Sequence, residues 1–244
     1  MKIQLNKKDI LNKIFDPLSS ITENCILNIT PTNINTTVYS KDIGIYLHII
    51  YNNPINITEP IILNIGNINK LTKMINFIND DIIDIDINSN NIFFDTDKVK
   101  FKYHLLDDNV IIKPKINIES AKNYKYDCEF NIITDKMNSL IKASSIASKN
   151  NKLYFWTKEG KVFAEINDYT QSNIDSISIN INDSYIGSEI INPIPYKFEI
   201  IKVISQLYKV ANINCKFNFD KQFMLMSING ADYSLTYLIQ GMTK

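Results

Sequence analysis

The stretch Glu129–Asp168 reads EFNIITDKMNSLIKASSIASKNNKLYFWTKEGKVFAEIND, and it predicts a strand, a helix and a hairpin in that order. Cys128–Ile132 is a short run of β-forming residues, and Thr134 is a typical residue to cap the helix that follows. Apolar or small residues then recur at helical spacing: Met137, Leu140, Ile141, Ser144 and Ala147. The period then changes to two, and Glu159-Gly160 predicts the turn of a hairpin.

The same order of elements, βαβββ, recurs four times along the chain, although the copies share few letters. The helices of the other three copies are expected at about Asp9–Ile21, Asn67–Asn79 and Phe198–Val210. The strands that lead into them are expected at Lys2–Asn6, Pro60–Ile65 and Ile190–Ile194. The strands that follow them are expected at Cys25–Thr30, Thr36–Ser40, Gly44–Tyr51, Asp81–Asn88, Asn91–Asp95, Lys98–Leu106, Cys215–Phe219, Gln222–Ile228 and Tyr233–Gln240, with Ser176–Ile181 closing the third copy.

This repeat predicts an α+β protein of two similar domains, each made of two βαβββ units with antiparallel sheets. We place the domains at residues 1–110 and 126–244, joined by a connector at 111–125. A chain of 244 residues with 45% hydrophobic residues is long enough to bury a core in each domain.

The charges are balanced, with 26 basic and 26 acidic residues, and every basic residue apart from the two histidines is a lysine. A neutral chain is not an obvious nucleic-acid binder, so the distribution of its lysines matters more than their number. Without arginine, any anion must be held by lysine point charges and backbone amides.

The sequence carries no sign of secretion or membrane insertion, so a cytoplasmic protein is expected. Lys2, Lys7 and Lys8 are not followed by the apolar core of a signal peptide, and no stretch has the length of a membrane span. Cys25, Cys128 and Cys215 each lie in an expected strand, which favours buried, reduced thiols.

No catalytic or metal motif is present, so neither an enzyme nor a cofactor is expected. His48 and His104 each stand alone in an expected strand, where a structural role is the usual one. Acidic residues in Asp80–Asp86 alternate with isoleucine, which is typical of a half-buried strand with a solvated face. No metal site is therefore predicted.

Each expected helix places at least one lysine away from its apolar face. These lysines are candidates to face DNA: Lys13, Lys70, Lys73, Lys142, Lys149, Lys202 and Lys209. Ordinary solvated helix faces would give the same pattern, so it does not establish DNA binding by itself.

Three blocks of the sequence resemble DNA polymerase sliding clamps, most closely the T-even-phage type and more distantly the proliferating-cell-antigen clamps. They are KIQLNKKDILNKI from Lys2, ITDKMNSLIKASSIASKNNKLYFWTKEGKVFAEIND from Ile133, and INGADYSLTYLIQ from Ile228. The chain departs from those clamps in its neutral charge and its lack of arginine.

The resemblance implies a DNA-clamp fold, in which a homotrimeric ring of two-domain subunits carries its sheets outside and its helices on the inner face around duplex DNA. It implies a processivity factor for DNA replication, with a DNA polymerase and an ATP-dependent clamp loader as partners and no chemistry of its own. The DNA contacts would be sequence-independent, between channel lysines and phosphates.

The resemblance also implies a pocket for partner proteins beside the connector, whose sequence is more apolar than a free linker needs. The candidates to line it are Val38, Ile43, Val110, Ile111, Ile112, Ile116, Tyr237 and Ile239. Subunits would join by pairing edge strands, with Ser176–Ile181 as one edge and either Ile92–Asp95 or Lys98–Leu106 as the other.

Two other functions stay open from the sequence alone. One is a processivity factor that does not form a ring and holds DNA by charge. The other is a β-rich structural or interaction protein without a DNA role.

Overall fold

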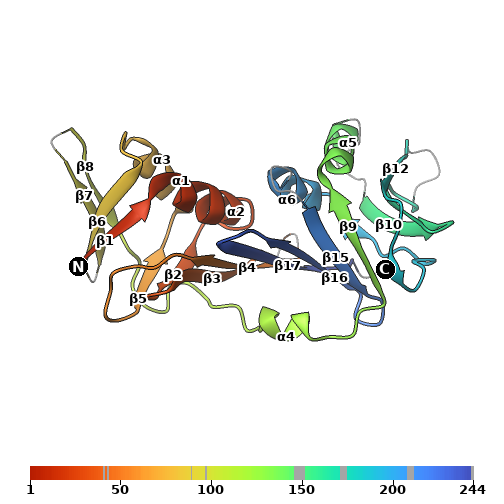
Figure 1. Cartoon of the computed structure of the whole chain (residues 1–244), viewed down its shortest axis with the longest axis horizontal. Helices are drawn as coiled ribbons and strands as arrows, with labels where there is room; N and C mark the ends of the chain where they lie inside the picture. Colours follow the sequence, from red (N-terminus) through yellow and green to blue (C-terminus); the bar gives the residue numbers. More distant parts are fainter. Residues whose placement is uncertain are drawn as a thin grey trace. The chain divides into compact units, whose positions relative to one another are not determined.

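The chain forms two compact units in the computed structural model, which is coloured along the sequence in Figure 1. The structure describes residues 1–40, 42, 44–88, 90–96, 98–145, 152–170, 175–207 and 212–242. Unit 1 contains Met1–Tyr39, Leu47–Ile116 and Asn229–Leu235, and unit 2 contains Ser40–Tyr46, Asn117–Ile228 and Thr236–Lys244. Each unit therefore includes a short segment from the other half of the chain.

Unit 1 has two groups of antiparallel strands. The first is a sheet in the order β1-β6-β7-β8, made of Lys2–Asn6, Ile82–Asn88, Asn91–Asp95 and Lys100–His104. The second runs in the order β5-β2-β3-β4, made of Ile61–Ile65, Cys25–Ile29, Asn33–Ser40 and Ile45–Asn52, of which unit 1 holds β3 up to Tyr39 and β4 from Leu47. The predicted strands are thus present, with ends that move by a few residues.

Two helical segments of unit 1 pack against each other. The first runs without a break through α1 (Lys7–Asp9), the π-helical turn η1 (Ile10–Phe15) and α2 (Asp16–Ser19), and the second is α3 (Ile68–Asn76). The wide turn ends just before Pro17, which has no N–H to continue an α-helical ladder. The sequence predicted this helix but not its π-helical turn.

The core of unit 1 follows the periodicity of its sequence. In β6, Ile83, Ile85 and Ile87 are buried while Asp84 stays exposed, as the alternation predicted. The helices contribute a stripe of buried residues that includes Ile10, Leu11, Ile14, Leu18, Leu71 and Ile75. The acidic run is therefore the solvated face of a half-buried strand.

Unit 2 also has two groups of strands. One is a sheet in the order β12-β11-β10-β14, made of Ile177–Asn182, Lys161–Asn167, Lys152–Lys158 and Tyr196–Lys197. The other runs in the order β13-β9-β15-β16-β17, made of Ile186–Gly187, Cys128–Ile133, Asn212–Asn218, Phe223–Asn229 and Tyr233–Gln240, of which unit 2 holds β16 up to Ile228 and β17 from Thr236. The helices are α4 (Ile118–Lys122), α5 (Thr134–Ser144) and α6 (Ile200–Leu207).

The decisive stretch Glu129–Asp168 folds as predicted into strand β9, helix α5 and the hairpin β10–β11. Glu159 and Gly160 both have positive φ angles, 53° and 75°, which is the geometry of a tight two-residue hairpin turn. Thr134 is the first helical residue and not the cap, because Ile133 holds the cap position without a side-chain hydrogen bond. The α+β prediction with antiparallel sheets is confirmed.

One predicted strand is wrong. Ile190–Ile194 is irregular, and the strand that leads to α6 is the short β14 at Tyr196–Lys197. Pro193 and Pro195 have no N–H to donate to a neighbouring strand, which disfavours a regular strand over this segment. Strand β13 (Ile186–Gly187) and helix α4 (Ile118–Lys122) were not predicted from the sequence.

The core of unit 2 is rich in aromatic rings. Phe217 stacks on Phe130 with ring centroids 5.4 Å apart, and Phe155 meets Phe217 edge-on at 5.5 Å. Tyr196 of β14 joins the same cluster and is completely buried. Because such pairs add specific geometry to apolar burial, this cluster fixes how β9, β10, β14 and β15 pack together.

The end of β11 is held by a buried carboxylate. Asp168 accepts hydrogen bonds from the Thr170 hydroxyl at 2.6 Å and from the Thr170 N–H at 3.1 Å, and Lys152 Nζ lies 3.1 Å from it. These hydrogen bonds, with a smaller contribution from the charge of Lys152, lower the pKa of Asp168 to about 2.

Replacing Asp168 by asparagine is expected to make the stability of the protein depend less on pH between pH 5 and pH 3. The folded-state pKa lies below the unfolded value of about 3.9, so the ionised carboxylate stabilises the fold above pH 4 and loses that effect as the pH falls toward 2. Urea midpoints at pH 5 and pH 3 should therefore differ less for Asp168→Asn than for the parent chain. Two results would contradict this role of Asp168. One is a difference between pH 5 and pH 3 that is as large in Asp168→Asn as in the parent chain. The other is an equally reduced difference in the control Asp175→Asn, which alters an exposed carboxylate.

Candidate nucleic-acid interface

Helix α3 presents two uncommitted lysines to solvent. Leu71 and Ile75 are buried on one face, while Lys70 and Lys73 are exposed on the other. Asn67 fixes the start of the helix, because its side chain accepts a hydrogen bond from the N–H of Lys70 at 2.8 Å. Lys70 and Lys73 therefore project from a rigid, capped helix, as their positions in the sequence predicted.

Helix α5 offers one exposed lysine among its described residues. Lys142 is exposed, whereas Lys136 is half-buried and donates to Asn180 Oδ1 of β12 at 3.1 Å. Met137 and Leu140 are buried beneath the helix. Lys136 thus holds α5 to the sheet, and Lys142 is the side chain left to meet an anion.

The remaining C-terminal lysine candidates cannot be placed. Lys149 and Lys209 lie outside the described residues, and the side chain of Lys202 in α6 is not described. The neighbours of Lys202 along the helix, Ile201 and Val203, are both buried. Contacts between DNA and Lys149, Lys202 or Lys209 therefore stay predictions.

Lys13 differs from the other candidates because its charge is already satisfied within unit 1. Its Nζ lies 2.6 Å from Asp232 and 2.9 Å from Asp9, and 5.0 Å from the centre of the Tyr51 ring. Burial lowers the pKa of the ammonium, but hydrogen bonds and charges from Asp232 and Asp9 outweigh it, and the net shift is upward. Its side chain is 20% exposed, so the main role of Lys13 is to form ion pairs within unit 1, and it is not a free surface charge.

Replacing Lys13 by methionine is expected to lower the free energy of unfolding by about 1–2 kcal/mol, between the values typical of exposed and buried ion pairs. The change leaves Asp9 and Asp232 facing each other without the cation that separates them. Urea denaturation measures the effect, with the exposed Lys8→Met on the same helical segment as the matched control. Equal stability of the two variants would show that the ion pairs contribute nothing.

The candidates for a partner pocket fall into two groups. Val110 and Ile112 are 58% and 88% exposed in unit 1, Ile116 is also exposed, and Ile111 is half-buried. The other candidates do not lie on the surface: Val38, Tyr237 and Ile239 are core residues with at most 5% exposure. The prediction that these three residues line a partner pocket is wrong, because their side chains point into the core and leave no surface for a partner. Ile43 lies outside the described residues.

The second half of the connector is a short helix, α4, which the sequence analysis missed. Asn117 accepts a hydrogen bond from Ser120 N–H at 3.3 Å, and this capping signal was readable in the sequence. Ala121 packs in a cluster with Phe223, Leu225 and Leu238, and Tyr126 donates its hydroxyl to the Ala121 carbonyl at 2.5 Å. This part of the connector is therefore fixed to the sheet of unit 2.

Each unit has a four-stranded sheet with two outer strands. In unit 2 these are β12 and the short β14, and β12 lies at the expected edge Ser176–Ile181. In unit 1 they are β1 and β8, whereas β7 lies between β6 and β8. Ile92–Asp95 is therefore excluded as an edge, and the other expected edge, Lys98–Leu106, remains, because it contains β8.

The described side chains form no arrangement typical of a reaction centre. No group of three or more His, Cys, Asp or Glu residues in the described ranges is placed to hold a metal ion. His48 Nδ1 lies 2.8 Å from the Thr37 hydroxyl, on a strand surface. The three cysteines are buried and free of disulfides, as expected. No described helix is long and apolar enough to span a membrane.

Comparison with known proteins finds likeness in structure but not in sequence. No family model matches the chain, and no curated protein matches it. The proliferating cellular nuclear antigen of Entamoeba histolytica is similar with a TM-score of 0.75 at 11% identity, over 99% of this chain and 98% of that one. The A. fulgidus PCNA bound to the C-terminal region of FEN-1 is similar with a TM-score of 0.76 at 11% identity, over 100% of this chain and 98% of that one.

A third similar structure, the PCNA2–PCNA3 complex of Sulfolobus tokodaii, gives a TM-score of 0.75 at 11% identity over 99% of both chains. At this identity the likeness concerns the fold alone. It extends over nearly the whole of each chain and agrees with the antiparallel sheets and paired helices of both units. The chain therefore has the DNA-clamp fold of the PCNA sliding clamps.

Proposed function

We propose that this chain is a sliding clamp, a processivity factor that closes into a homotrimeric ring around duplex DNA and tethers the replicative polymerase. The observation that carries the proposal is the clamp fold over nearly the full length of the chain. The free edge strands β8 and β12, one in each unit, support it, because head-to-tail pairing of two different edges generates a closed ring.

The mechanism we propose is topological and involves no chemistry. A closed ring leaves DNA only by opening or by reaching an end, so a polymerase attached to it keeps a high effective concentration at the template. A separate ATP-dependent loader would open the ring. The neutral charge suits this mechanism, since a ring that slides must not bind phosphates tightly.

We assign the DNA contacts first to Lys70, Lys73 and Lys142, whose side chains are exposed on helices. Lysine on a rigid helix meets phosphates without reading the base sequence, which permits sliding. Lys149, Lys202 and Lys209 belong to the same proposal. Lys13 is ranked last because Asp9 and Asp232 already neutralise it.

Partner proteins are proposed to bind at the exposed apolar side chains Val110, Ile112 and Ile116. The A. fulgidus clamp binds the C-terminal region of FEN-1, and by analogy we expect short terminal segments of a polymerase and a loader to bind this chain. A T-even-phage type of clamp, working in the cytoplasm of a host cell, is part of the same proposal.

Covalent closure of the ring around circular DNA tests this function without a loader. Cysteines introduced at Lys102 of β8 and Ser178 of β12 would be joined across subunits by a flexible bismaleimide. Burial raises the pKa of Cys25 to about 12 and of Cys128 to about 11, and raises that of Cys215 as well, so the native thiols react slowly near pH 7.

After cross-linking on nicked circular DNA, we expect protein to stay on the circle through a high-salt wash and to be released when the circle is cut. Release by salt from the intact circle would favour a factor that holds DNA by charge. No association with DNA before or after closure would favour a structural protein without a DNA role.

A further inference from the structure

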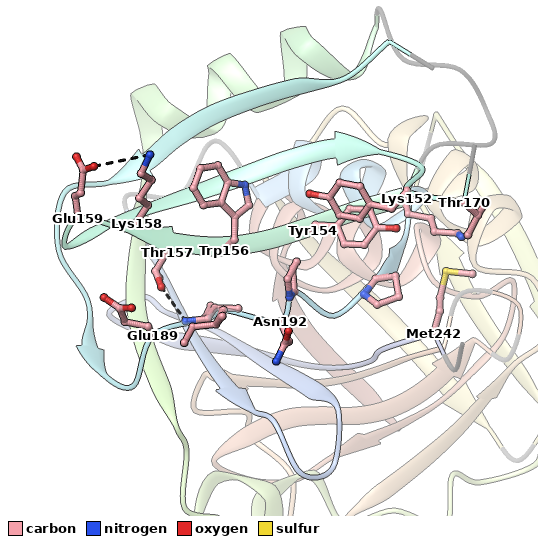
Figure 2. A pocket seen from close by; sticks show the side chains of 15 residues that line it. Lys152, Tyr154, Trp156, Thr157, Lys158, Glu159, Thr170, Glu189, Asn192 and Met242 are labelled. Atoms are coloured by element: carbon pink, nitrogen blue, oxygen red, sulfur yellow. Dashed lines mark hydrogen bonds and ion pairs between the residues drawn. The ribbon is translucent and has the colours of Figure 1, made fainter. Parts of the chain in front are cut away.

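Unit 2 contains a groove of about 1100 Å³ that the proposed DNA and partner surfaces do not use. Its floor is the outer face of β10, with Tyr154 and Trp156, and its wall is the segment from Glu189 to Pro195 together with Met242 (Figure 2). We call it the Trp156 groove. Its volume is slightly above the range of about 300–1000 Å³ that is typical of small-molecule sites.

The groove exists because β10 and its neighbouring segment pair only near their ends. Lys152 and Leu153 pair with β14, and Thr157 N–H donates to the Ile190 carbonyl at 3.3 Å. Between these two anchors Pro193 and Pro195 have no N–H to donate to a neighbouring strand. The wall is therefore fixed at both ends and stands off from the aromatic floor.

The floor is made of aromatic rings that pack against neighbouring rings. Trp156 stacks on Phe163 with ring centroids 4.3 Å apart and planes inclined by 12°. Tyr154 is only 4% exposed and packs at 4.6 Å on Tyr169, which is 56% exposed and also lines the groove. On the wall Ile191 is 75% exposed, which is unusual for a large apolar side chain beside such a floor. The groove thus offers a preorganised apolar surface, which keeps the entropy cost of binding low.

The charges around the groove are balanced except at one end. Lys152 is paired with Asp168 at 3.1 Å, and Lys158 lies 3.8 Å from Glu159. Glu189 is exposed and accepts the Tyr185 hydroxyl at 3.2 Å, and no ion pair to it occurs among the described residues. Figure 2 places Glu159 and Glu189 at the same end of the groove. The uncompensated charge there is a carboxylate, so it favours a cation on whatever binds.

We propose that the Trp156 groove binds a proline-rich segment of a partner protein, with a basic residue at the end marked by Glu189. Rigid aromatic grooves bind polyproline II segments well, because such segments are extended and ordered before they bind. The basic flank meets the unmatched carboxylate. This site goes beyond the proposed ring function and does not depend on it.

Tryptophan fluorescence tests the proposal directly, because Trp156 is the only tryptophan of the chain. The probes are three synthetic ten-residue peptides: proline-leucine repeats with two terminal arginines, the same repeats with two glutamates, and a glycine-serine sequence with the two arginines. We expect a saturable change in emission with the first peptide, with Kd on the order of 10–100 μM, and at least tenfold weaker binding of the other two.

Variants of the full chain connect the signal to the groove. Ile191→Glu should weaken binding of the arginine peptide at least tenfold, and Glu189→Lys should shift the preference to the glutamate peptide. Ile186→Glu is the matched control, since Ile186 is 74% exposed in the same unit but does not line the groove. It should bind like the parent chain.

Three results would overturn the proposal. The first is no saturable change with the proline-arginine peptide up to millimolar concentration. The second is equal loss of binding in Ile186→Glu and Ile191→Glu. The third is a change in emission on dilution of the protein alone that Ile191→Glu abolishes, because it would identify a second copy of the chain as the occupant.

Discussion

Reversing the charge of Lys73 and Lys142 together is expected to weaken binding to duplex DNA about tenfold at low salt. Both side chains are exposed on helices, one in each unit. Each lost phosphate contact should reduce the slope of log K against log salt by about 0.9, so the double variant Lys73→Glu/Lys142→Glu should lose about 2 from that slope. Fluorescence anisotropy with a labelled 30-base-pair duplex over a range of salt concentrations measures both quantities.

The matched control carries the same change of net charge away from the helices. Lys98→Glu/Lys161→Glu alters one exposed lysine in each unit, in the turn before β8 and at the start of β11. This control should keep the salt slope of the parent chain, with a smaller loss of affinity. Equal slopes for the two double variants would show that the helix lysines are not special, and the DNA-facing assignment would fail.

A proline at Ser178 is expected to abolish the trimer while leaving the subunit folded. Thr157 directs its N–H away from β11, toward Ile190. Along an antiparallel ladder, pairs that exchange hydrogen bonds alternate with pairs that do not. Like Thr157 and Val162, Phe155 and Ala164 are therefore a pair whose N–H groups point away from each other. Ala164 of β11 therefore directs its N–H toward Ile179 of β12, its register partner. Ser178 then directs its N–H to the free edge, so Ser178→Pro removes the hydrogen bond that the proposed ring would form to a neighbouring subunit and none to β11.

Ser178→Ala is the control, because it keeps the amide and removes only the exposed hydroxyl. Sedimentation velocity should find Ser178→Ala as a trimer and Ser178→Pro as a monomer, with a loss of at least about tenfold in association, the equivalent of one or more intersubunit hydrogen bonds. Circular dichroism should be the same for both. A trimer of Ser178→Pro would exclude β12 as the subunit edge.

The sequence predicts most of the fold because periodicity reports which face of an element is buried. In β6, isoleucines alternate with aspartates, and the structure buries Ile83, Ile85 and Ile87 as this alternation predicts. Helix α3 is found from its apolar spacing, and its exposed Lys70 and Lys73 follow from the same spacing. Such local patterns need no knowledge of distant partners.

The parts that failed depend on contacts between distant residues or on local backbone geometry. Lys13 forms an ion pair with Asp232, which is 219 residues away in the sequence. The sequence around either residue gives no local signal of this pair. Ile190–Ile194 reads as an apolar strand, but its prolines disfavour a regular strand, and the segment lines the Trp156 groove. Tyr237 and Ile239 were candidates for a pocket, yet the same apolar character places them in the core.

The central claim is the ring, and its most direct test is the absolute mass of the chain in solution. Light scattering behind size exclusion should be measured over a wide range of protein concentrations, because a loosely closed ring dissociates on dilution. We expect a species of three times the subunit mass of 28.2 kDa, at least at the higher concentrations. A mass of one subunit at every concentration would contradict the ring and, with it, topological tethering by the free protein.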